Sequence, residues 1–374
     1  MLRIGFDAKR LFYNLTGLGN YSRTLVRNLS AYHPDHHYYL YSPRLKRKPE
    51  TTFFLNSPSF ATREAPHRFH AFWRSYGLNQ QLRRDQLQIF HGLSNELPRG
   101  LPRGIKGVVT IHDLIFKHRP DWYPWIDRNI YDLKFRHSCQ RADHIIAISA
   151  CTKADIIRHY AIPPEKISVI YQSCHPKFMQ TLSDRRRKAA CAKYGLPLDY
   201  ILYVGSVIER KNLLGLLQGL RALPKDLRLP LVVIGKGGDY LKKVKAYIAA
   251  NGMQASVFFP ASFDGADLPA LYQQARLLAY PSYYEGFGIP IIEALFSRTP
   301  VLTARAASLP EAGGPGAHYV DPASTEEMAE GLRRLISDDA YRAQLVEAGL
   351  AYVQRFDAER TAAAVIAVYE SCME

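Results

Sequence analysis

The sequence is poor in cysteine and has no long apolar run. Its five cysteines among 374 residues are odd in number and lack C-x-x-C or zinc-site spacing, which argues against a disulfide framework and favours a reducing compartment. No segment approaches the ~18 to 20 uninterrupted apolar residues of a membrane span. The start of the chain, a strand-like segment at residues 2–7, also lacks the apolar core of a signal peptide. We therefore expect a cytoplasmic protein.

Acidic residues are scarce relative to basic ones. The chain has 34 Asp and Glu against 49 Lys and Arg, which gives a net charge of +15 and a pI of about 9.5. A positive field of this size attracts nucleic acids, anionic membrane faces and anionic substrates alike. The basic residues are dispersed and no nucleic-acid module is recognisable, so we expect no nucleic-acid partner. The other two classes stay open.

Short apolar runs alternate with amphipathic stretches along the whole chain. This rhythm is typical of parallel strands joined by crossover helices. Since 374 residues exceed what one core usually takes, we predict an α/β protein of two Rossmann-like domains. The predicted strands cover residues 3–6, 89–90, 107–111, 144–148, 167–170, 200–204, 231–234, 257–259, 277–280 and 301–303.

The periodicity lapses between residues 174 and 194, where a polar and basic connection begins. We place the domain boundary there and predict domains at residues 1–180 and 181–357. Residues 358–374 are rich in Ala and Val at helical spacing. They predict a C-terminal helix that could pack on either domain, and we place it back on the N-terminal one.

The first strand leads into a glycine-rich turn and then into a helical pattern at residues 22–29. Gly17 and Gly19 in this turn would let backbone amides approach an anion, aided by the positive end of the helix. Equally, they could mark a tight connection that needs a positive φ angle at one of the two glycines. The dinucleotide fingerprint needs a third glycine, which is absent, so a nicotinamide-linked oxidoreductase is disfavoured.

Two adjacent cations follow a strand of the second half. The strand at residues 200–204 runs into Gly205 and then into Arg210 and Lys211, before a helical run at residues 213–220. Ligands of open α/β sheets lie at the carboxyl ends of strands, where a diphosphate is the natural partner of two cations. Cations are disfavoured beside the positive end of a helix, so this interpretation is favoured over a solvated basic helix start.

Residues 280–294 form the most informative stretch. A strand ends there in a glycine-rich loop at residues 286–288, with Glu285 just before the loop and Glu293 in the first turn of a helix that begins at about Pro290. Loop amides can meet a sugar, and a helix carboxylate can accept hydrogen bonds from two neighbouring ribose hydroxyls. Without a ligand, the helix carboxylate would compensate the helix dipole and the loop carboxylate would be an ordinary surface group.

This pattern resembles glycosyltransferase family 4, retaining enzymes of the GT-B fold, in which two Rossmann-like domains face each other across the active-site cleft. The family signature is a Glu, seven residues and a second Glu, here Glu285 and Glu293. The resemblance also takes in the turn at residues 17–19, His112 at a strand end and the cations at residues 210–211. It therefore spans essentially the whole chain, and the combination is more specific than any one part.

The resemblance implies a role for each of these residues. Glu293 would hold the nucleoside ribose and Glu285 the hydroxyls of the transferred sugar. Arg210 and Lys211 would bind the diphosphate, and His112 would contact a hydroxyl of the donor sugar, although a lone strand-end histidine is more often structural. The predicted catalytic residues are His112, Arg210, Lys211 and Glu285. The predicted donor-binding residues are Gly17, Gly19, Gly205, Arg210, Lys211, Gly286, Phe287, Gly288 and Glu293.

The expected chemistry needs positive charge, because the departing nucleoside diphosphate gains negative charge as the glycosidic bond breaks. Transferases of the other major nucleotide-sugar fold use a metal held by a D-x-D motif, which this chain lacks. Arg210, Lys211 and the helix N-termini can supply the positive field instead. We therefore predict no metal ligands and no cofactor, the nucleoside-diphosphate sugar being a substrate. The resemblance further implies front-face transfer, in which the leaving phosphate oxygen helps to deprotonate the acceptor.

By the same resemblance, residues 1–180 bind the acceptor and residues 181–357 the nucleotide sugar. Residues 63–84 of the N-terminal domain mix cations with aromatic side chains, which suits an anionic membrane surface or a lipid pyrophosphate and equally an ordinary solvated loop and helix. The expected acceptor is a saccharide or a lipid-pyrophosphate-linked group, with peripheral contact at the inner face of the cell membrane. The residues behind this expectation are His67, Phe69, His70, Phe72, Trp73, Arg74 and Tyr76.

The most specific expectation is mannose transfer from GDP-mannose in the synthesis of a cell-surface polysaccharide or lipopolysaccharide, because the chain most resembles bacterial mannosyltransferases of the family. Pro260 and Ala261 stand where many relatives have a Gly near the base, which leaves the base open. A UDP-sugar or a deoxyhexose donor is therefore an alternative. A two-domain sugar-nucleotide epimerase is another, and it would convert its sugar nucleotide without an acceptor.

Overall fold

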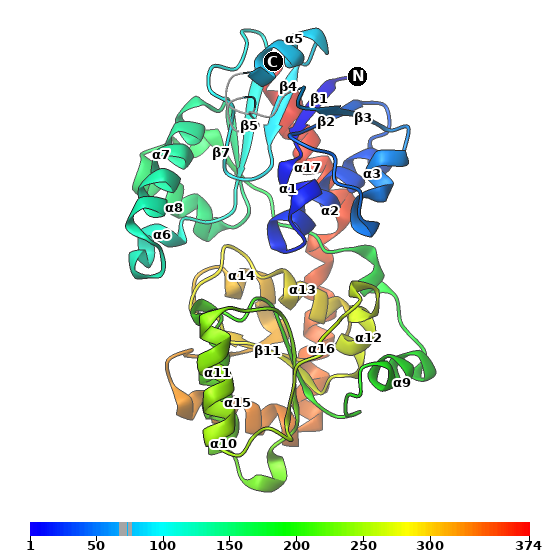
Figure 1. Cartoon of the computed structure of the whole chain (residues 1–374), viewed down its shortest axis with the longest axis vertical. Coiled ribbons are helices and arrows are strands. Elements are labelled where there is room, and N and C mark those ends of the chain that lie inside the picture. The colour runs from blue at the N-terminus through cyan, green and yellow to red at the C-terminus, as the bar shows by residue number, and fades with distance from the viewer. Residues whose placement is uncertain (67–72, 74–76) are drawn as a thin grey trace. The chain divides into compact units, whose positions relative to one another are not determined.

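The computed structural model describes residues 1–66, 73 and 77–374 (Figure 1). The chain divides into two compact units, Met1–Ser173 with Phe356–Glu374, and Cys174–Arg355. Both units are α/β folds built on a wholly parallel sheet, which confirms the predicted fold class. The division at Ser173 stands beside the boundary predicted after residue 180, and the C-terminal segment groups with the first unit.

The first unit contains a seven-stranded sheet in the order β3-β2-β1-β4-β5-β6-β7. Its strands are β1 (Arg3–Asp7), β2 (His37–Ser42), β3 (Phe60–Glu64), β4 (Ile89–Gly92), β5 (Lys106–Ile111), β6 (His144–Ala147) and β7 (Ile167–Val169). Its described α-helices are α1 (Lys9–Tyr13), α2 (Gly17–Tyr32), α3 (Thr52–Asn56), α5 (Leu78–Arg84), α6 (Ile115–His118), α7 (Trp125–Arg141), α8 (Ala150–Tyr160) and α17 (Ala358–Ser371).

Apolar cores cover both faces of this sheet, as parallel sheets require. One core joins the sheet to α1, α2 and α17, with Phe6 and Leu29 among its buried members. The other joins it to the elements around α5, α7 and α8, with Leu82 and Ile156 among its buried members. Helix α17 lies against α2 (Figure 1), and its Tyr369 hydroxyl is 2.6 Å from Nδ1 of the buried His91. The C-terminal helix is thus part of the first unit.

The second unit contains a six-stranded sheet in the order β10-β9-β8-β11-β12-β13. Its strands are β8 (Ile201–Val204), β9 (Leu231–Ile234), β10 (Val257–Phe258), β11 (Leu277–Tyr280), β12 (Val301–Ala304) and β13 (Ala317–Val320). Its α-helices are α9 (Asp184–Lys193), α10 (Leu213–Ala222), α11 (Asp239–Ala250), α12 (Leu268–Gln274), α13 (Ile289–Phe296), α14 (Leu309–Gly313), α15 (Thr325–Ser337) and α16 (Asp339–Val353).

All ten predicted strands are present, with small differences at their ends. Strands β2, β3 and β13 were not predicted from the sequence. Strand β2 is a run of tyrosines whose rings are buried while two of their hydroxyls bond to Asp85 and to the end of α2. The other two are short and carry polar residues on half-buried faces. Both are edge strands that pair with one neighbour each, so they need no continuous apolar run.

No helix of the described part of the chain is long and apolar enough to cross a membrane.

Candidate functional site

The order of strands in each sheet reverses at one point, and crevices in doubly wound sheets open at such points. In the second unit the reversal lies between β8 and β11, which are neighbours in the sheet and both parallel. The loop that follows β8 and the loop that follows β11 therefore meet at the carboxyl edge. These loops carry Arg210, Lys211 and Glu285, so the predicted diphosphate and sugar residues come together although ~75 residues separate them in sequence.

Glu285 forms ion pairs with both cations. Its Oε2 lies 2.5 Å from Nη1 of Arg210 and its Oε1 lies 2.7 Å from Nζ of Lys211. Burial would raise the pKa of Glu285, but the two cations outweigh burial and lower that pKa to about 2. The carboxylate is therefore ionised at any physiological pH, and the cluster of two cations and one anion keeps a net positive charge.

Two further residues fix the position of Lys211. Its Nζ also bonds to the hydroxyl of Tyr280 at 2.5 Å, and the aromatic ring of Tyr280 lies 4.4 Å from Nζ. The side chain of Lys211 packs against Gly205. A Cβ added to Gly205 would lie 3.0 Å from Cδ of Lys211, and the φ of 142° at Gly205 also disfavours any residue with a side chain. Burial lowers the pKa of Lys211, and the Glu285 carboxylate opposes that shift.

The glycine-rich loop after Glu285 is held from below by a serine. The Ser308 hydroxyl donates to the carbonyl of Glu285 at 2.8 Å and to that of Phe287 at 3.1 Å. The Phe287 side chain is buried, so this residue can contact the nucleotide sugar through its backbone but not through its ring. Gly288 has a φ of 137° and is the N-cap of α13, where the chain turns from the loop into the helix. The loop amides therefore stand at the positive end of α13.

Glu293 lies just past the first turn of its helix, whereas the sequence predicted it within that turn. Helix α13 begins at Ile289, so Glu293 falls beyond the first turn, and simple dipole compensation explains it less well. Its carboxylate is buried and accepts a hydrogen bond from the Tyr272 hydroxyl at 2.9 Å. Burial raises the pKa of Glu293 to about 7, although the Tyr272 bond and the nearby Lys177 both act against this rise. The two signature carboxylates thus have opposite electrostatic environments.

In the first unit, Gly17 and Gly19 belong to the helix rather than to a loop before it. Helix α2 begins at Gly17, and neither glycine has a positive φ, so the tight-turn interpretation is wrong. The amides of a first helical turn have no acceptor within the helix, which leaves them able to bind an anion. A Cβ on Gly19 would lie 1.7 Å from the carbonyl oxygen of Asn14, whereas one on Gly17 would meet nothing within 4 Å.

His112 follows β5 at the carboxyl edge of the first sheet and is almost fully buried. Its Nε2 lies 2.9 Å from the carbonyl oxygen of Leu93, so this nitrogen carries the proton and Nδ1 is the acceptor. The side-chain amide of Gln172 lies 3.4 Å from Nδ1, and the ring packs edge-on against Tyr21. Burial lowers the pKa of His112 to about 4. The neutral ring can accept a hydrogen bond from a hydroxyl but carries no positive charge.

The segment at residues 63–84 differs in part from its expectation. Trp73 is buried within the apolar core of the first unit, and Arg63 pairs with Asp85 at 2.8 Å. Trp73 therefore does not belong to an exposed aromatic surface, which was one of the two interpretations left open, whereas the paired Arg63 side chain is still half-exposed. Its other members, His67, Phe69, His70, Phe72, Arg74 and Tyr76, lie outside the described residues.

One group of possible metal ligands occurs in the described part of the chain. It comprises His118 at the end of α6 and Asp155 and His159 on α8, with ligand atoms within 4.8 Å of one another. His118 Nε2 lies 2.7 Å from Asp155 Oδ1, which is an ordinary hydrogen-bonded pair. The positive charges of Lys117 and Arg158 bear on His159 and would oppose a cation. The group is separate from the predicted site residues.

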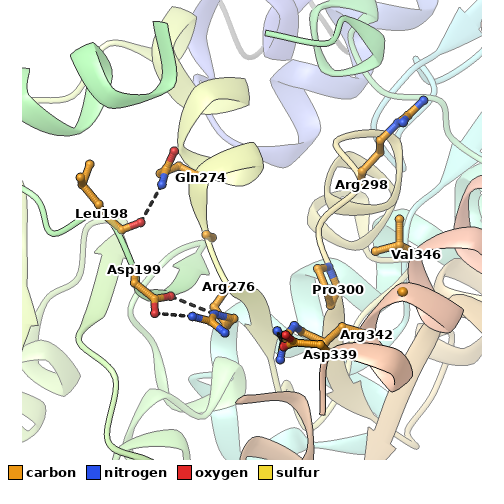
Figure 2. Close-up of a pocket in the computed structure, with 11 residues that line it drawn as sticks. Leu198, Asp199, Gln274, Arg276, Arg298, Pro300, Asp339, Arg342 and Val346 are labelled. Atoms are coloured by element: carbon orange, nitrogen blue, oxygen red, sulfur yellow. Dashed lines mark hydrogen bonds and ion pairs between the residues drawn. The ribbon is translucent and has the colours of Figure 1, made fainter. Parts of the chain in front are cut away.

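A hollow of about 570 Å³ opens at the other edge of the second sheet (Figure 2). Its lining includes residues 198–199, 274–276 and Pro300, which directly precede β8, β11 and β12 and so mark the amino ends of the strands. Asp199 and Arg276 within it neutralise each other at 2.5 Å. Because ligands of doubly wound sheets bind at the carboxyl ends, we do not place a donor here.

No role was assigned to Tyr272 from the sequence, and none to Tyr280 or Ser308 although both lie in segments that resemble those of the family. Tyr280 is the last residue of a predicted strand, and its place at the carboxyl edge of a parallel sheet was a usable signal. Tyr272 lies in an amphipathic helix, where nothing local distinguishes it from a core residue. Ser308 lies before α14, and its contact with the loop depends on the pairing of β11 with β12.

Comparison with known proteins places both units in one class. The profile of the glycosyl transferases group 1 matches residues 192–351, and that of glycosyltransferase family 4 matches residues 15–176. O-antigen chain mannosyltransferase B of Escherichia coli is 29% identical over 388 residues, which cover 99% of this chain and all of that protein. O-antigen chain mannosyltransferase RfbU of Salmonella typhimurium is also 29% identical, over 61% of this chain and 60% of its own length.

A solved structure agrees with the fold. HepE from Anabaena, in complex with UDP and glucose, superimposes with a TM-score of 0.78 at 16% identity and covers 99% of this chain and all of HepE. This likeness shows the GT-B architecture of two Rossmann-like sheets. With the matched profiles and the full-length relative, the chain belongs to the GT4 glycosyltransferases and is a hexosyltransferase.

Proposed function

We propose that this enzyme transfers mannose from GDP-mannose, with retention of anomeric configuration, to a saccharide or lipid-linked acceptor in cell-surface polysaccharide synthesis. The observation that carries the proposal is the end-to-end likeness to an O-antigen chain mannosyltransferase. A second O-antigen mannosyltransferase, RfbU, resembles part of the chain and supports the same sugar. Membership in a family of transferases also favours transfer over the epimerase alternative.

The geometry at the end of β8 supports a diphosphate as ligand. Arg210 and Lys211 present two cations against a single carboxylate, so the cluster can accept further negative charge. When a diphosphate binds, its oxygens can share these donors with Glu285 without leaving a buried cation unpaired. The cations are preorganised by their present partners, which is the condition for stabilising charge that develops on the leaving group.

The carboxylates divide the work of holding the donor. Glu285 stays ionised because its pKa is about 2, so it accepts hydrogen bonds from sugar hydroxyls and is unsuited to proton transfer at neutral pH. Once it is ionised, Glu293 can accept hydrogen bonds from two ribose hydroxyls. With no side chain assigned as the base, the departing phosphate oxygen takes the acceptor proton. His112, neutral and with Nδ1 as acceptor, contacts a hydroxyl of the sugar.

The choice of base and sugar is the part of the proposal that most needs a direct test. HepE binds UDP and glucose, so a UDP-sugar is the main alternative donor to compare with GDP-mannose. The purified protein is incubated with GDP-mannose, UDP-glucose, UDP-N-acetylglucosamine or a deoxyhexose nucleotide, and melting temperature and released nucleotide are measured. A ligand at 100 times its dissociation constant stabilises the protein by about 2.7 kcal/mol.

We expect stabilisation by GDP-mannose and nucleotide release that depends on an added lipid-pyrophosphate-linked oligosaccharide, with an α-mannosyl product by NMR. If a UDP-sugar gave stabilisation and turnover and GDP-mannose gave neither, the proposed donor would be wrong, but the assignment as a transferase would stand. Conversion of the nucleotide sugar without any acceptor would contradict transfer and restore the epimerase interpretation.

A further inference from the structure

A set of buried hydrogen bonds links the C-terminal helix of the first unit to α2. The hydroxyl of Tyr369 on α17 lies 2.6 Å from Nδ1 of His91, and Nε2 of His91 lies 2.8 Å from the hydroxyl of Thr110. The Thr110 hydroxyl lies 2.9 Å from the hydroxyl of Tyr21, in the second turn of α2. All four side chains are buried, and none of them is among the predicted site residues. These four residues form the hydroxyl network.

The His91 ring gives the hydroxyl network a direction. Burial lowers the pKa of His91 to about 3, so the ring is neutral, and one of its nitrogens donates a hydrogen bond while the other accepts one. Burial also raises the pKa of Tyr21 and that of Tyr369, so both keep their hydroxyl hydrogens. The bonds on the two sides of the His91 ring therefore run the same way, and neither can be reversed without the other. A satisfied network of this kind is rigid.

Tyr21 is the member of the network that reaches the predicted contacts of the nucleotide sugar. Its hydroxyl meets Thr110, and its ring packs edge-on against the His112 ring with the centroids 4.7 Å apart. Side chains two residues apart along a strand share a face, and Thr110 lies near the end of β5 with His112 just after it. Tyr21 also lies about one turn after Gly17, the first residue of α2. One side chain thus connects the first-turn amides of α2 to His112.

Other contacts hold the backbone and the protonated nitrogen of His112. Its amide donates to Oδ1 of Asn95 at 2.8 Å, and its Nε2 donates to the carbonyl of Leu93 at 2.9 Å. These contacts come from the loop after β4, whereas Tyr21 comes from α2. Displacing the Tyr21 ring would therefore change how Nδ1 of His112, the proposed acceptor for a sugar hydroxyl, lies relative to α2. A misplacement of about 1 Å can lower a reaction rate by on the order of 100-fold.

We infer that Tyr21 is a positioning residue that keeps the first-turn amides of α2 and His112 in one arrangement for the nucleotide sugar. The rest of the hydroxyl network, which ends at Tyr369 on the C-terminal helix, holds Tyr21 in place. The inference rests on the proposed contacts of α2 and His112, but not on which sugar is transferred. A network that served only the fold would change stability and leave turnover untouched, which separates the two roles.

The test compares two variants of Thr110. Thr110→Val keeps the shape of the side chain and removes its hydroxyl, whereas Thr110→Ser keeps the hydroxyl and removes a methyl group. Tyr21→Phe and Tyr369→Phe remove the hydroxyls at the two ends of the network. Tyr38→Phe is the matched control, because the Tyr38 hydroxyl is also buried and donates to two carbonyls at the other end of α2.

Turnover, KM for the nucleotide sugar and melting temperature are measured for each protein, with GDP-mannose or with a UDP-sugar if wild type uses that instead. We expect Tyr21→Phe and Thr110→Val to lower turnover by about tenfold and to change KM by less than about threefold, since misalignment acts on the transition state. Tyr369→Phe should lower turnover by about threefold, because it acts only through its neighbours in the network. Combining Tyr21→Phe with Thr110→Val should add little, because the two changes remove the same bond.

Thr110→Ser should turn over at nearly the wild-type rate, and Tyr38→Phe should melt earlier than wild type but turn over normally. Normal turnover in Tyr21→Phe and Thr110→Val would overturn the inference. So would equal losses in Thr110→Val and Thr110→Ser, which would indicate packing, or a loss in Tyr38→Phe as large as that in Tyr21→Phe.

His112→Gln is measured beside these variants because it tests the proposed sugar contact itself. We expect its turnover to fall at least as far as that of Tyr21→Phe. Normal turnover in His112→Gln would remove the sugar contact and the present inference with it. Impaired His112→Gln with normal network variants would overturn the present inference alone and leave the proposed function standing.

Discussion

At the scale of single residues, two glutamates eight positions apart illustrate how environment sets chemistry. Glu285 is buried against two cations and Glu293 is buried against a tyrosine hydroxyl, so burial acts alike on both and the partners decide the difference. The result is a pKa of about 2 for one and of about 7 for the other. Only Glu293 changes its charge in the physiological range.

Donor affinity should therefore depend on pH through Glu293. The folded protein binds the proton of Glu293 more tightly than an unfolded chain does, because its pKa of about 7 exceeds the ordinary value of 4.5. Ionising it costs stability as pH rises between these values, and donor binding to the carboxylate repays part of that cost. As pH rises toward 7, we expect the dissociation constant of the nucleotide sugar to fall by up to about tenfold per pH unit. Above pH 7 it should level off. Calorimetry from pH 5.5 to 8.5 checks this.

The control for this pH dependence is Glu293→Gln. A neutral amide loses charge-assisted bonds that are worth roughly 1.5 to 3 kcal/mol each, so nucleotide binding should weaken while circular dichroism stays unchanged. The pH dependence of the remaining affinity should vanish. If the variant binds as tightly as wild type, or keeps the same pH profile, then Glu293 does not hold the ribose.

Arg210 and Lys211 should act mainly in the transition state, where leaving-group charge exceeds that of the bound substrate. Lys211→Ala is expected to lower turnover by about 100-fold or more at saturating donor, the scale for one preorganised electrostatic donor. Arg210→Lys should also impair turnover, because an ammonium lacks the fork of a guanidinium. Steady-state kinetics decides, with Lys243→Ala as a control at an exposed cation of α11. Near-normal turnover in a folded variant would remove that residue from the mechanism.

Tyr280 should act through Lys211 rather than on the donor. Tyr280→Phe keeps the ring against Nζ and removes the hydroxyl that holds it, so we expect turnover to fall by roughly 10-fold with little change in KM. In a Lys211→Ala background the same change should have almost no further effect, because contacting residues are not additive. Independent, additive losses in the double variant would show that Tyr280 has a merely structural role.

At the scale of elements, the start of α2 separates binding from packing. Gly17→Ala adds a methyl group to open space in a helix, so the melting temperature should hold or rise slightly, yet the methyl would obstruct an anion at the helix end. Gly19→Ala forces its Cβ into the Asn14 carbonyl and should cost about 1 to 3 kcal/mol. Thermal unfolding and donor titration of both variants test this. Unchanged donor binding in Gly17→Ala would argue that α2 meets no phosphate.

The elements also show what the sequence could predict. Strands with continuous apolar runs, such as β8 and β11, were predictable because both of their faces are buried. Strand β2 was not, since the buried hydroxyl of Tyr41 is satisfied by Asp85, a contact distant in sequence. The same holds in the site: Glu285 and Lys211 follow from motif spacing, whereas the bond of Lys211 to Tyr280 depends on the adjacency of β8 and β11.

At the scale of the whole molecule, the net charge of +15 serves an enzyme whose donor is anionic. A broad positive field raises the encounter rate with nucleotide sugars and with anionic membranes, and both effects weaken as salt screens the field. The field is assembled from Lys and Arg dispersed along the chain. Among the cations that the structure describes, Arg210 and Lys211 lie at the carboxyl ends of β8 and β11 with a buried carboxylate partner.

Because these fixed charges can neutralise the leaving diphosphate, turnover should persist in excess EDTA. We expect less than a twofold change after prolonged dialysis against the chelator, measured as nucleotide released at saturating donor. The cluster of His118, Asp155 and His159 makes a second readout useful. If this cluster holds a metal, removing the metal with EDTA should lower the melting temperature without changing turnover. His159→Gln should abolish that shift in melting temperature. Catalysis by protein charges alone would be contradicted if EDTA abolished turnover and magnesium or manganese restored it. The same loss would have to occur in His159→Gln, so that the cluster could not explain it.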